Sequence, residues 1–274
     1  METHGKIPQN QVVAIIPARH SSVRLPGKLL LEAGGKPLIV HTLERVRSAR
    51  LPDRVIVAVD SKDLFQAVTD AGGEAVMTSA DHQSGSDRIA EVAMGIPGEP
   101  LIVNVQGDEP MISPSVIDSA VHALVEDPKA DISTTCERMG SAEEVLNPDA
   151  VKVVAGPDGY AMYFSRSPIP YPREAVRKWG DLRTALLEEP GLVQGFRKHT
   201  GLYVYRKEAL IKFSSLRPST AESSEMLEQL RALENGMRIK VVEVAERSLG
   251  IDTEADLVAF REHISATLRE PAGY

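Results

Sequence analysis

One stretch near the start of the chain, residues 12–28, most restricts the folds that this sequence allows. It begins with the apolar run Val-Val-Ala-Ile-Ile, which is followed by Pro17. Such a short run predicts a buried strand of a parallel sheet, and the proline, which lacks a backbone N–H, predicts its end. A loop with the cations Arg19, Arg24 and Lys28 follows. Because ligands bind beyond the carboxyl ends of such strands, we expect these cations at a ligand-binding edge.

The chemistry of this loop suits a phosphate chain. Its three cations stand beside backbone N–H groups, and Gly27 allows the backbone to approach a ligand closely. The loop is not a Walker A motif, because Lys28 is followed by Leu29, and it is not the G-x-G-x-x-G dinucleotide loop. The alternative interpretation is a basic loop that only faces water, and the loop alone does not decide between the two.

Strand-like and helix-like segments alternate after this loop. Apolar runs predict strands, and a 3.6-residue periodicity with capping residues predicts helices. The predicted strands lie at 55–59, 75–77 and 101–105, and the predicted helices at 37–48, 63–71 and 86–94. This alternation predicts an α/β fold with a doubly wound, mostly parallel sheet.

The second half of the chain is less regular. Strands are predicted at 131–136, 151–155, 160–164, 200–205 and 239–244, and helices at 222–235 and 254–267. The segment 167–194 is rich in proline and charge, so we expect an insertion or a loop region there. We therefore expect a disordered tail at 1–11 and a single domain at 12–270. Within that domain, residues 130–215 would form a smaller lobe on a mixed part of the sheet.

Composition excludes several classes of protein. The 274 residues are 42% hydrophobic, so a large core can form, and a formal net charge of −8 argues against nucleic-acid binding. The single cysteine, Cys136, lies in a predicted strand and is expected to be a buried thiol. No run of transmembrane length and no signal peptide is visible, which predicts a cytoplasmic protein without membrane insertion.

Two further loops follow the predicted sheet edge. The segment His-Gln-Ser-Gly-Ser-Asp-Arg, residues 82–88, is either a helix cap or a second ligand loop. Strand 101–105 leads into Gln-Gly-Asp-Glu-Pro, where Asp108 is either part of a turn or a magnesium ligand. A companion carboxylate, Asp252, precedes Thr253, which we expect to cap the last helix.

A third group of residues suits a sugar acid. Arg166 follows an apolar stretch with no acid before Glu174, and an arginine fork binds a carboxylate well. His199 and Tyr203 lie in a predicted strand. Glu225 and Gln229 are four residues apart, which predicts a shared helix face. The alternatives are a core histidine, a solvated helix face and a surface arginine.

These motifs together resemble those of a known family, the sugar nucleotidylyltransferases. The resemblance covers roughly residues 12–262 and is carried by the loop 12–28, by 82–88, by Gln-Gly-Asp-Glu-Pro, by Asn-Pro-Asp-Ala-Val-Lys-Val-Val, by Tyr-Phe-Ser-Arg and by Glu-Met-Leu-Glu-Gln-Leu-Arg. It is closest to the cytidylyltransferases that activate acidic sugars. This resemblance implies CTP and the acidic sugar 3-deoxy-manno-octulosonate (KDO) as substrates, Mg²⁺ as cofactor, and a homodimer whose smaller lobe serves sugar binding and dimerisation.

The resemblance also implies roles for individual residues. It implies nucleotide binding by Ala18, Arg19, Arg24, Lys28, Gln83, Ser84, Gly85, Arg88, Gln106 and Gly107. It implies catalytic roles for Arg19, Lys28, Asp108 and Asp252, the two aspartates being the metal ligands. It implies sugar binding by Gln106, Arg166, His199, Tyr203, Glu225 and Gln229.

Three other functions remain open at this point. The acceptor could be another acidic sugar, such as sialic acid or 8-amino-KDO. A non-catalytic nucleotide-sugar-binding paralogue would be expected to lack a carboxylate or a loop cation, and none is missing. A glycosyltransferase would place its metal on an Asp-x-Asp motif, whereas Asp108 is followed by Glu109 and Pro110.

Overall fold

The computed structural model describes residues 12–21, 25–247 and 249–269, and these form two compact units. The first unit comprises the described residues within Met1–Asp118, Arg206–Ser214 and Ser248–Tyr274, and the second comprises Ser119–Tyr205 and Ser215–Arg247. The stretch predicted to form a smaller lobe, about 130–215, overlaps the second unit for most of its length.

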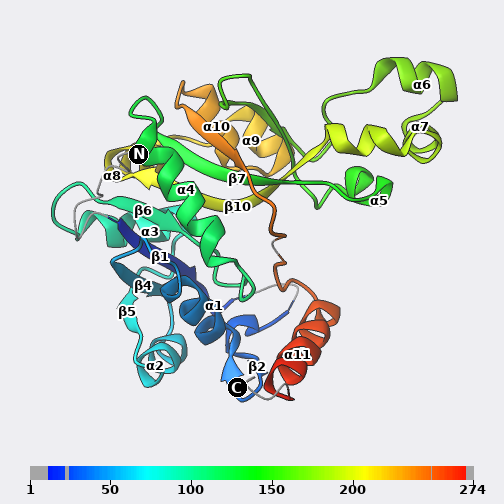
Figure 1. The fold of residues 1–274 in the computed structure, drawn as a ribbon. Coiled ribbons are helices and arrows are strands. Elements are labelled where there is room, and N and C mark those ends of the chain that lie inside the picture. Colours follow the sequence, from blue (N-terminus) through cyan, green and yellow to red (C-terminus); the bar gives the residue numbers. More distant parts are fainter. Residues whose placement is uncertain (1–11, 22–24, 248, 270–274) are drawn as a thin grey trace, which may run out of the picture. The chain divides into compact units, whose positions relative to one another are not determined.

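Four parallel strands form the sheet of the first unit (Figure 1). They are β1 (Val12–Ala18), β4 (Arg54–Val59), β5 (Glu74–Met77) and β6 (Leu101–Asn104), in the order β6-β1-β4-β5. All seven residues of β1 are buried, as expected for the central strand of a parallel sheet. The four predicted strands of this half are confirmed.

Helices cover both faces of this sheet. The connections from β1 to β4 to β5 run through α1 (Leu38–Arg47) and α2 (Lys62–Asp70). The chain then returns through α3 (Gly85–Met94) to β6, on the other side of β1. Because such crossovers are right-handed, α3 packs on the face opposite α1 and α2, and the sheet is doubly wound. The strand order reverses between β1 and β6, and at such a reversal ligands bind beyond the carboxyl ends of the strands.

Smaller elements complete the first unit. A 3₁₀ turn, η1 (Lys28–Leu30), and a two-stranded ribbon of β2 (Glu32–Ala33) and β3 (Lys36–Pro37) follow the loop after β1. The last helix, α11 (Glu254–Arg269), buries Leu257 and Phe260 in a small apolar cluster with Leu38 and Ile251. Helix α4 (Pro114–Glu126) is shared between the units, and α8 (Lys207–Ser215) lies almost wholly in the first.

The second unit has a mixed sheet of five strands: β7 (Ile132–Arg138), β8 (Lys152–Ala155), β9 (Ala161–Ser165), β10 (Arg197–Arg206) and β11 (Ile239–Glu243). Strand β7 pairs with β11 in parallel and with β10 in antiparallel fashion, and β8 joins β10 to β9 with antiparallel pairing. The predicted strands of this half are confirmed within a few residues.

The second unit departs from two expectations. The segment 167–194, expected to be an insertion or a loop region, is not a loop, because it contains α6 (Arg173–Trp179), α7 (Leu182–Glu188) and the 3₁₀ helix η2 (Pro190–Gly195). It is ordered by a separate apolar cluster in which α7 and η2 pack against α5 (Ala142–Leu146). The helix expected at 222–235 is two helices, α9 (Thr220–Glu225) and α10 (Gln229–Glu234). They are separated at Met226, whose φ of 52° lies in the left-handed region.

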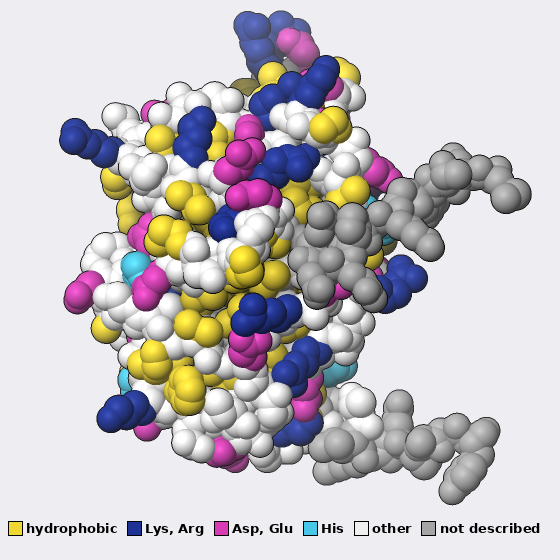
Figure 2. All heavy atoms as spheres, turned by 90° about the vertical axis from the view of Figure 1, so that its left-hand side faces the viewer, with side chains coloured by type: hydrophobic (Ala, Val, Ile, Leu, Met, Phe, Trp, Pro, Cys, Tyr) yellow, Lys and Arg dark blue, Asp and Glu magenta, His cyan; other side chains and the backbone are white. Residues whose placement is uncertain are grey.

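Cys136 lies in β7 and is buried, as predicted. Burial, together with the nearby carboxylate of Glu243, raises the pKa of its thiol to about 11. On the face shown in Figure 2, Lys and Arg side chains lie among Asp and Glu side chains, with hydrophobic side chains between them. Among the described helices, none is both long enough and apolar enough to cross a bilayer.

Candidate functional site

Three loops of the first unit meet at the carboxyl ends of β1 and β6. A Cβ atom added to Gly85, at the start of α3, would lie 3.4 Å from the ring of Pro17 in β1 and 3.9 Å from the side-chain oxygen of Gln106 after β6. A Cβ at Gly107 would lie only 2.9 Å from the carbonyl oxygen of Pro17, so this position requires glycine. The backbones of the predicted nucleotide loops therefore come together at the switch point of the sheet.

A cation and two carboxylates form the charged centre of this region. Lys28 Nζ lies 2.5 Å from Asp108 Oδ2 and 3.0 Å from Asp252 Oδ1. The lysine side chain is 9% exposed, whereas those of Asp108 and Asp252 are 31% and 42% exposed. Both aspartates therefore pair with the same buried ammonium, and each carboxylate remains partly exposed to solvent.

Local backbone contacts explain how positions so far apart in the sequence meet. The backbone N–H of Ile251 donates to the carbonyl oxygen of Asp108 over 2.9 Å, which places Asp252 beside Asp108. Thr253 caps α11, because its hydroxyl accepts from the backbone N–H of Asp256 while the Asp256 carboxylate accepts from the backbone N–H of Thr253. The predicted cap at Thr253 is confirmed.

The donor set of this centre fits a magnesium ion. Asp108 and Asp252 already converge on a single positive charge, with the Lys28 ammonium standing where a divalent cation could bind. Among the described residues no cluster of three or more metal-binding side chains occurs. Two carboxylates completed by water and substrate phosphates is the arrangement that Mg²⁺ prefers.

The other predicted residues of the phosphate loop differ in exposure. Ala18 ends β1 and is buried, and Arg19, directly after it, is exposed. Arg24 lies outside the described residues. Lys28 begins η1, after Gly27 with a φ of 65°. The left-handed backbone at Gly27 turns the chain so that Lys28 points back toward the aspartates.

The second loop leads into a helix, as the capping interpretation predicts, but the capping residue is Ser84 and not Ser86 or Asp87. The Ser84 hydroxyl accepts from the backbone N–H of Asp87 over 3.1 Å at the start of α3. Gln83 is exposed, and its amide donates to the carbonyl oxygen of Asp81. Whether these residues contact a nucleotide base is not tested by the fold and stays a prediction.

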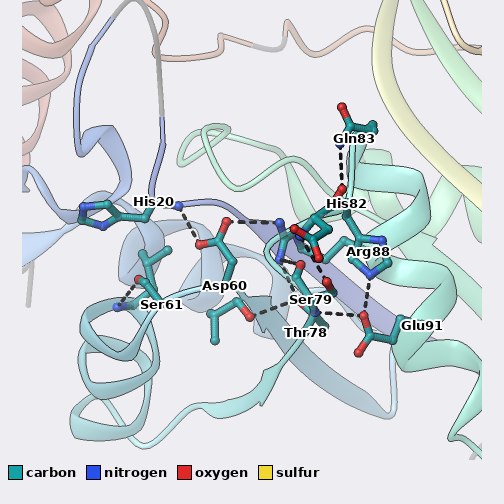
Figure 3. A network of polar contacts seen from close by, with 12 residues as sticks. His20, Asp60, Ser61, Thr78, Ser79, His82, Gln83, Arg88 and Glu91 are labelled. Atoms are coloured by element: carbon teal, nitrogen blue, oxygen red, sulfur yellow. Dashed lines mark hydrogen bonds and ion pairs between the residues drawn. The ribbon is translucent and has the colours of Figure 1, made fainter.

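Arg88 does not fit its expected role as a nucleotide ligand. Its side chain is 4% exposed and is bonded to protein groups (Figure 3). Nη2 pairs with Asp60 Oδ2 at 3.1 Å, and Nη1 donates to Thr78 Oγ1 at 2.6 Å. The sequence shows Arg88 beside the loop, but its position on α3 turns it inward to the end of β4.

The predicted sugar-binding residues lie in the second unit, where His199 is held as a neutral ring. Its Nε2 lies 2.8 Å from the Thr134 hydroxyl, which itself donates to the carbonyl oxygen of Leu202 at 2.6 Å. Because a hydroxyl has one proton to donate, His199 Nε2 carries the hydrogen and Nδ1 is left as an acceptor. Burial lowers the pKa of His199 to about 3, so the ring is neutral at physiological pH.

Tyr203 accompanies this histidine. The two rings lie 5.2 Å apart between centroids, and Phe164 of β9 lies 5.0 Å from His199 on another side. Burial raises the pKa of the Tyr203 phenol well above its ordinary value, so it keeps its proton and remains a hydrogen-bond donor.

Arg166, the residue expected to bind the sugar carboxylate, is bonded to backbone groups in this structure, and its contact with a sugar stays a prediction. Its Nε donates to the carbonyl oxygen of Glu225 at 2.7 Å, and Nη1 donates to that of Pro148 at 3.0 Å. Nη2 lies 3.5 Å from the carbonyl oxygen of Met226. The sequence shows no acid close to Arg166 along the chain, but the fold brings Glu225 beside it, together with the carbonyl end of α9, where a cation is stabilising.

The expectation that Glu225 and Gln229 share a helix face is also wrong, because the chain breaks at Met226 between α9 and α10. The Glu225 carboxylate accepts from the Ser165 hydroxyl at 2.6 Å and from the backbone N–H of Arg166 at 2.9 Å. Gln229 begins α10 and is 7% exposed. Glu225 thus joins α9 to the end of β9.

The sequence patterns assign no role to two charged residues whose side chains the fold largely removes from solvent, Asp60 and Lys152. Asp60 follows β4 directly, a signal similar to the one that pointed to Asp108 in the loop that follows β6. Lys152, in β8, has no exposed surface, and its ammonium donates to the carbonyl oxygens of Asn147 and Ala150 at 2.9 and 2.7 Å. Burial, followed by the charge of Arg166, lowers its pKa.

Comparison with known proteins shows which family and which fold this chain shares. The family model for cytidylyltransferases matches residues 13–239. A solved structure described as CMP:2-keto-3-deoxy-manno-octonic acid synthetase complexed with CTP is 40% identical, with a TM-score of 0.83 over 94% of this chain and 99% of that one. The 4-diphosphocytidyl-2C-methyl-D-erythritol synthase of Anaerococcus prevotii, at 15% identity and a TM-score of 0.59, shares the fold.

Curated relatives extend the match over most of the chain. The 3-deoxy-manno-octulosonate cytidylyltransferase of Geobacter sulfurreducens is 49% identical over 90% of this chain and 96% of its own length. The protein of the same name from Solibacter usitatus is 42% identical over 96% of this chain and 98% of its own. The expected α/β fold of nucleotidylyltransferase type is confirmed. The chain therefore belongs to the cytidylyltransferase family, in the group of the 3-deoxy-manno-octulosonate cytidylyltransferases.

Proposed function

We propose that this protein transfers CMP from CTP to the anomeric hydroxyl of KDO and releases pyrophosphate. The observation that carries this proposal is the centre formed by Lys28, Asp108 and Asp252 at the switch point of a doubly wound sheet. Relatives at 42–49% identity that are named for this activity support the same substrates. The product would supply lipopolysaccharide synthesis in the cytoplasm.

In this reaction the sugar hydroxyl attacks the α-phosphorus in line, and pyrophosphate leaves. The protein contributes mainly position and charge. The exposed side chain of Arg19, together with Arg24, would bind the triphosphate. Asp108 and Asp252 would hold Mg²⁺, which supplies charge neutralisation at the phosphates and lowers the pKa of the attacking hydroxyl.

Lys28 has two roles in this scheme. Without substrate, its ammonium neutralises the two aspartates. With a divalent cation held by these carboxylates, Lys28 would no longer be needed to neutralise them. Its ammonium would then be available to bind the phosphates and to stabilise the leaving pyrophosphate. Release of one cation by another means that metal and CTP should bind more tightly together than separately.

The sugar side would use the neutral groups of the second unit. His199 Nδ1 accepts from a sugar hydroxyl, and the protonated Tyr203 phenol donates to a sugar oxygen. Gln229 would complete these contacts, and Gln106 of the first unit remains a separate candidate for sugar binding. Glu225 and Arg166 would support the site from behind, since Glu225 is bonded to Ser165 and Arg166 to carbonyl oxygens. We also propose a homodimer, in line with the family resemblance.

The test is a pyrophosphate-release assay with Mg²⁺, CTP and a panel of KDO, 8-amino-KDO and sialic acid. KDO should be the preferred acceptor, and omission of the sugar should abolish release. The kcat/KM for CTP should exceed that for UTP, ATP or GTP by about 10⁴, because a hydrogen-bonded base site strongly rejects a base that cannot make the same bonds. Preference for sialic acid would overturn the choice of sugar. Comparable turnover with ATP or GTP would overturn the assignment of the base site.

A further inference from the structure

Asp60 connects two of the three loops at the switch point. It follows β4, its side chain is 10% exposed, and both carboxylate oxygens are engaged (Figure 3). Oδ1 accepts from the backbone N–H of His20 at 2.8 Å, and Oδ2 accepts from Arg88 Nη2 at 3.1 Å. His20 is the residue directly after Arg19. Asp60 therefore determines where the chain goes as it leaves β1.

Arg88 carries the connection onward to α3. Its Nη1 donates to Thr78 Oγ1 at 2.6 Å and lies 3.3 Å from the carbonyl oxygen of Ser79. The Thr78 hydroxyl in turn donates to the carbonyl oxygen of Val59 at 3.0 Å. One guanidinium thus joins the ends of β4 and β5 to the helix that begins at Gly85.

A second pair holds the rest of this loop. The Glu91 carboxylate accepts from the backbone N–H of Ser79 at 3.1 Å and is paired with His82. This pair and its backbone contact lower the pKa of Glu91, so the carboxylate is charged at neutral pH. Residues 79–82 are therefore fixed to α3 at both ends, just before the predicted nucleotide-contacting residues Gln83 and Ser84.

A buried ion pair adds little to folding compared with a well-packed apolar pair of similar volume. What it provides is orientation, because a fully bonded carboxylate and guanidinium allow only one arrangement of their neighbours. Here the fixed neighbours are the backbone of residue 20 and the first turns of α3. Both flank the place where a triphosphate would bind.

We propose that Asp60 is a positioning residue for nucleotide binding. Asp60 accepts from both His20 and Arg88. It thereby sets the direction in which the chain at Arg19 leaves β1, and it fixes the start of α3 relative to that segment. This proposal rests on the proposed nucleotide site but assigns no contact between Asp60 and the nucleotide. It also gives Arg88 its function, as an anchor of the loop and not a ligand.

The test compares three variants of the full chain. Asp60→Ala removes both bonds. Asp60→Asn keeps an acceptor for His20 but presents an amide to Arg88. The matched control is Asp118→Ala, because Asp118 is also a buried carboxylate that accepts from two backbone N–H groups, those of Arg50 and Leu51, at 3.0 Å each. Those residues precede β4, at the opposite end of the strands from the nucleotide loops.

In Asp60→Ala the KM for CTP should rise at least tenfold, while the KM for KDO at saturating CTP changes less than twofold. The KM of Asp60→Asn for CTP should lie between those of Asp60→Ala and the wild type. Asp118→Ala should lower the melting temperature to a similar degree and leave the KM for CTP unchanged. If Asp60→Ala does not fold, Asp60→Asn decides by the same measurement.

A direct measurement separates this proposal from the assignment of the reaction. Calorimetric binding of CTP needs no turnover, so it stays informative if the wild type fails to use KDO. Weakened CTP binding in both Asp60 variants, with wild-type binding in Asp118→Ala, supports positioning. Wild-type CTP affinity in a folded Asp60→Asn variant overturns it. Equal losses in the Asp60 and Asp118 variants also overturn it, since general destabilisation would then explain both.

Discussion

Lys28 and Arg166 are both cations at predicted substrate sites, and the fold uses them differently. Lys28 is bonded to two carboxylates whose outer sides remain exposed. Arg166 is bonded through its Nε and Nη1 to backbone carbonyl oxygens of Glu225 and Pro148. The two carboxylates are partly exposed, so a second cation can reach them, whereas Arg166 is bonded to two separate carbonyl oxygens of the backbone. Lys28 therefore belongs to a centre that can rearrange, and Arg166 to a fixed support.

The strongest test of this contrast removes the carboxylates. Asp108→Asn and Asp252→Asn should each lower turnover by about 10² or more, because charge stabilisation in the transition state is lost. Both should fold, since the remaining aspartate still pairs with Lys28. Pyrophosphate release at saturating Mg²⁺ is the measurement, with Asp70→Asn, an exposed carboxylate on α2, as control. Near-normal activity in either variant would exclude that residue as a metal ligand.

Removal of Arg166 should act on stability instead. Arg166→Ala loses two short bonds to carbonyl oxygens and should lower the free energy of unfolding by about 3 kcal/mol. Arg166→Lys should recover only part of the lost free energy of unfolding, because an ammonium cannot bond to both of the separate carbonyl oxygens. Denaturant unfolding measures this, and Arg177→Ala, which changes an exposed arginine of α6, should stay within about 0.5 kcal/mol. Unchanged stability with a tenfold higher KM for KDO alone would restore the carboxylate contact.

The buried His199 of the second unit should also make the stability of the protein depend on pH. Above pH 6.5 His199 is neutral in both the folded and the unfolded chain. Below pH 6.5 the His199 ring becomes protonated in the unfolded chain, whereas in the folded chain it stays neutral down to about pH 3. As the pH is lowered through this range, the contribution of His199 to the free energy of unfolding should therefore fall by about 1.4 kcal/mol for each pH unit. His199→Gln should remove that slope, and an unaltered slope in urea titrations would contradict the buried neutral ring.

The smallest effect is expected from Lys28 itself, measured without nucleotide. In Lys28→Met the two aspartates lose their internal cation, so Mn²⁺ should bind about tenfold more tightly than to the wild type. Electron paramagnetic resonance counts free Mn²⁺ directly. Lys36→Met, which removes a lysine paired with Glu44 on the surface, is the control. Equal affinities in wild type and Lys28→Met would show that Lys28 does not compete for the carboxylates.

The first unit is the more predictable from sequence because its cues are local. Buried parallel strands such as β1 are short apolar runs, and caps such as Ser84 and Thr253 lie within three residues of their partners. The sequence patterns do not predict helices α4, α5 and α8. Apolar residues occur along most of α4 and leave little contrast between its faces, and α5 has only five residues, too few to show a period.

The second unit is less predictable because its contacts depend on distant backbone. Nothing in the sequence around Arg166 reveals that the carbonyl end of α9 will lie beside it. The break at Met226 is equally hidden, since a non-glycine residue with positive φ lacks a local signature. Asp60 could have been found from the sequence, because it follows a core strand directly and Asp108 was identified by a similar cue, in the loop that follows β6.

The buried thiol of β7 has a practical consequence. Thiol reagents attack the thiolate, and a pKa of about 11 in a side chain that is 4% exposed leaves almost none of it available at neutral pH. Because Cys136 is the sole cysteine, the natural chain already serves as a background for site-specific labelling. A single cysteine introduced on an exposed helix position, such as Glu188 of α7, would take up a maleimide fluorophore alone.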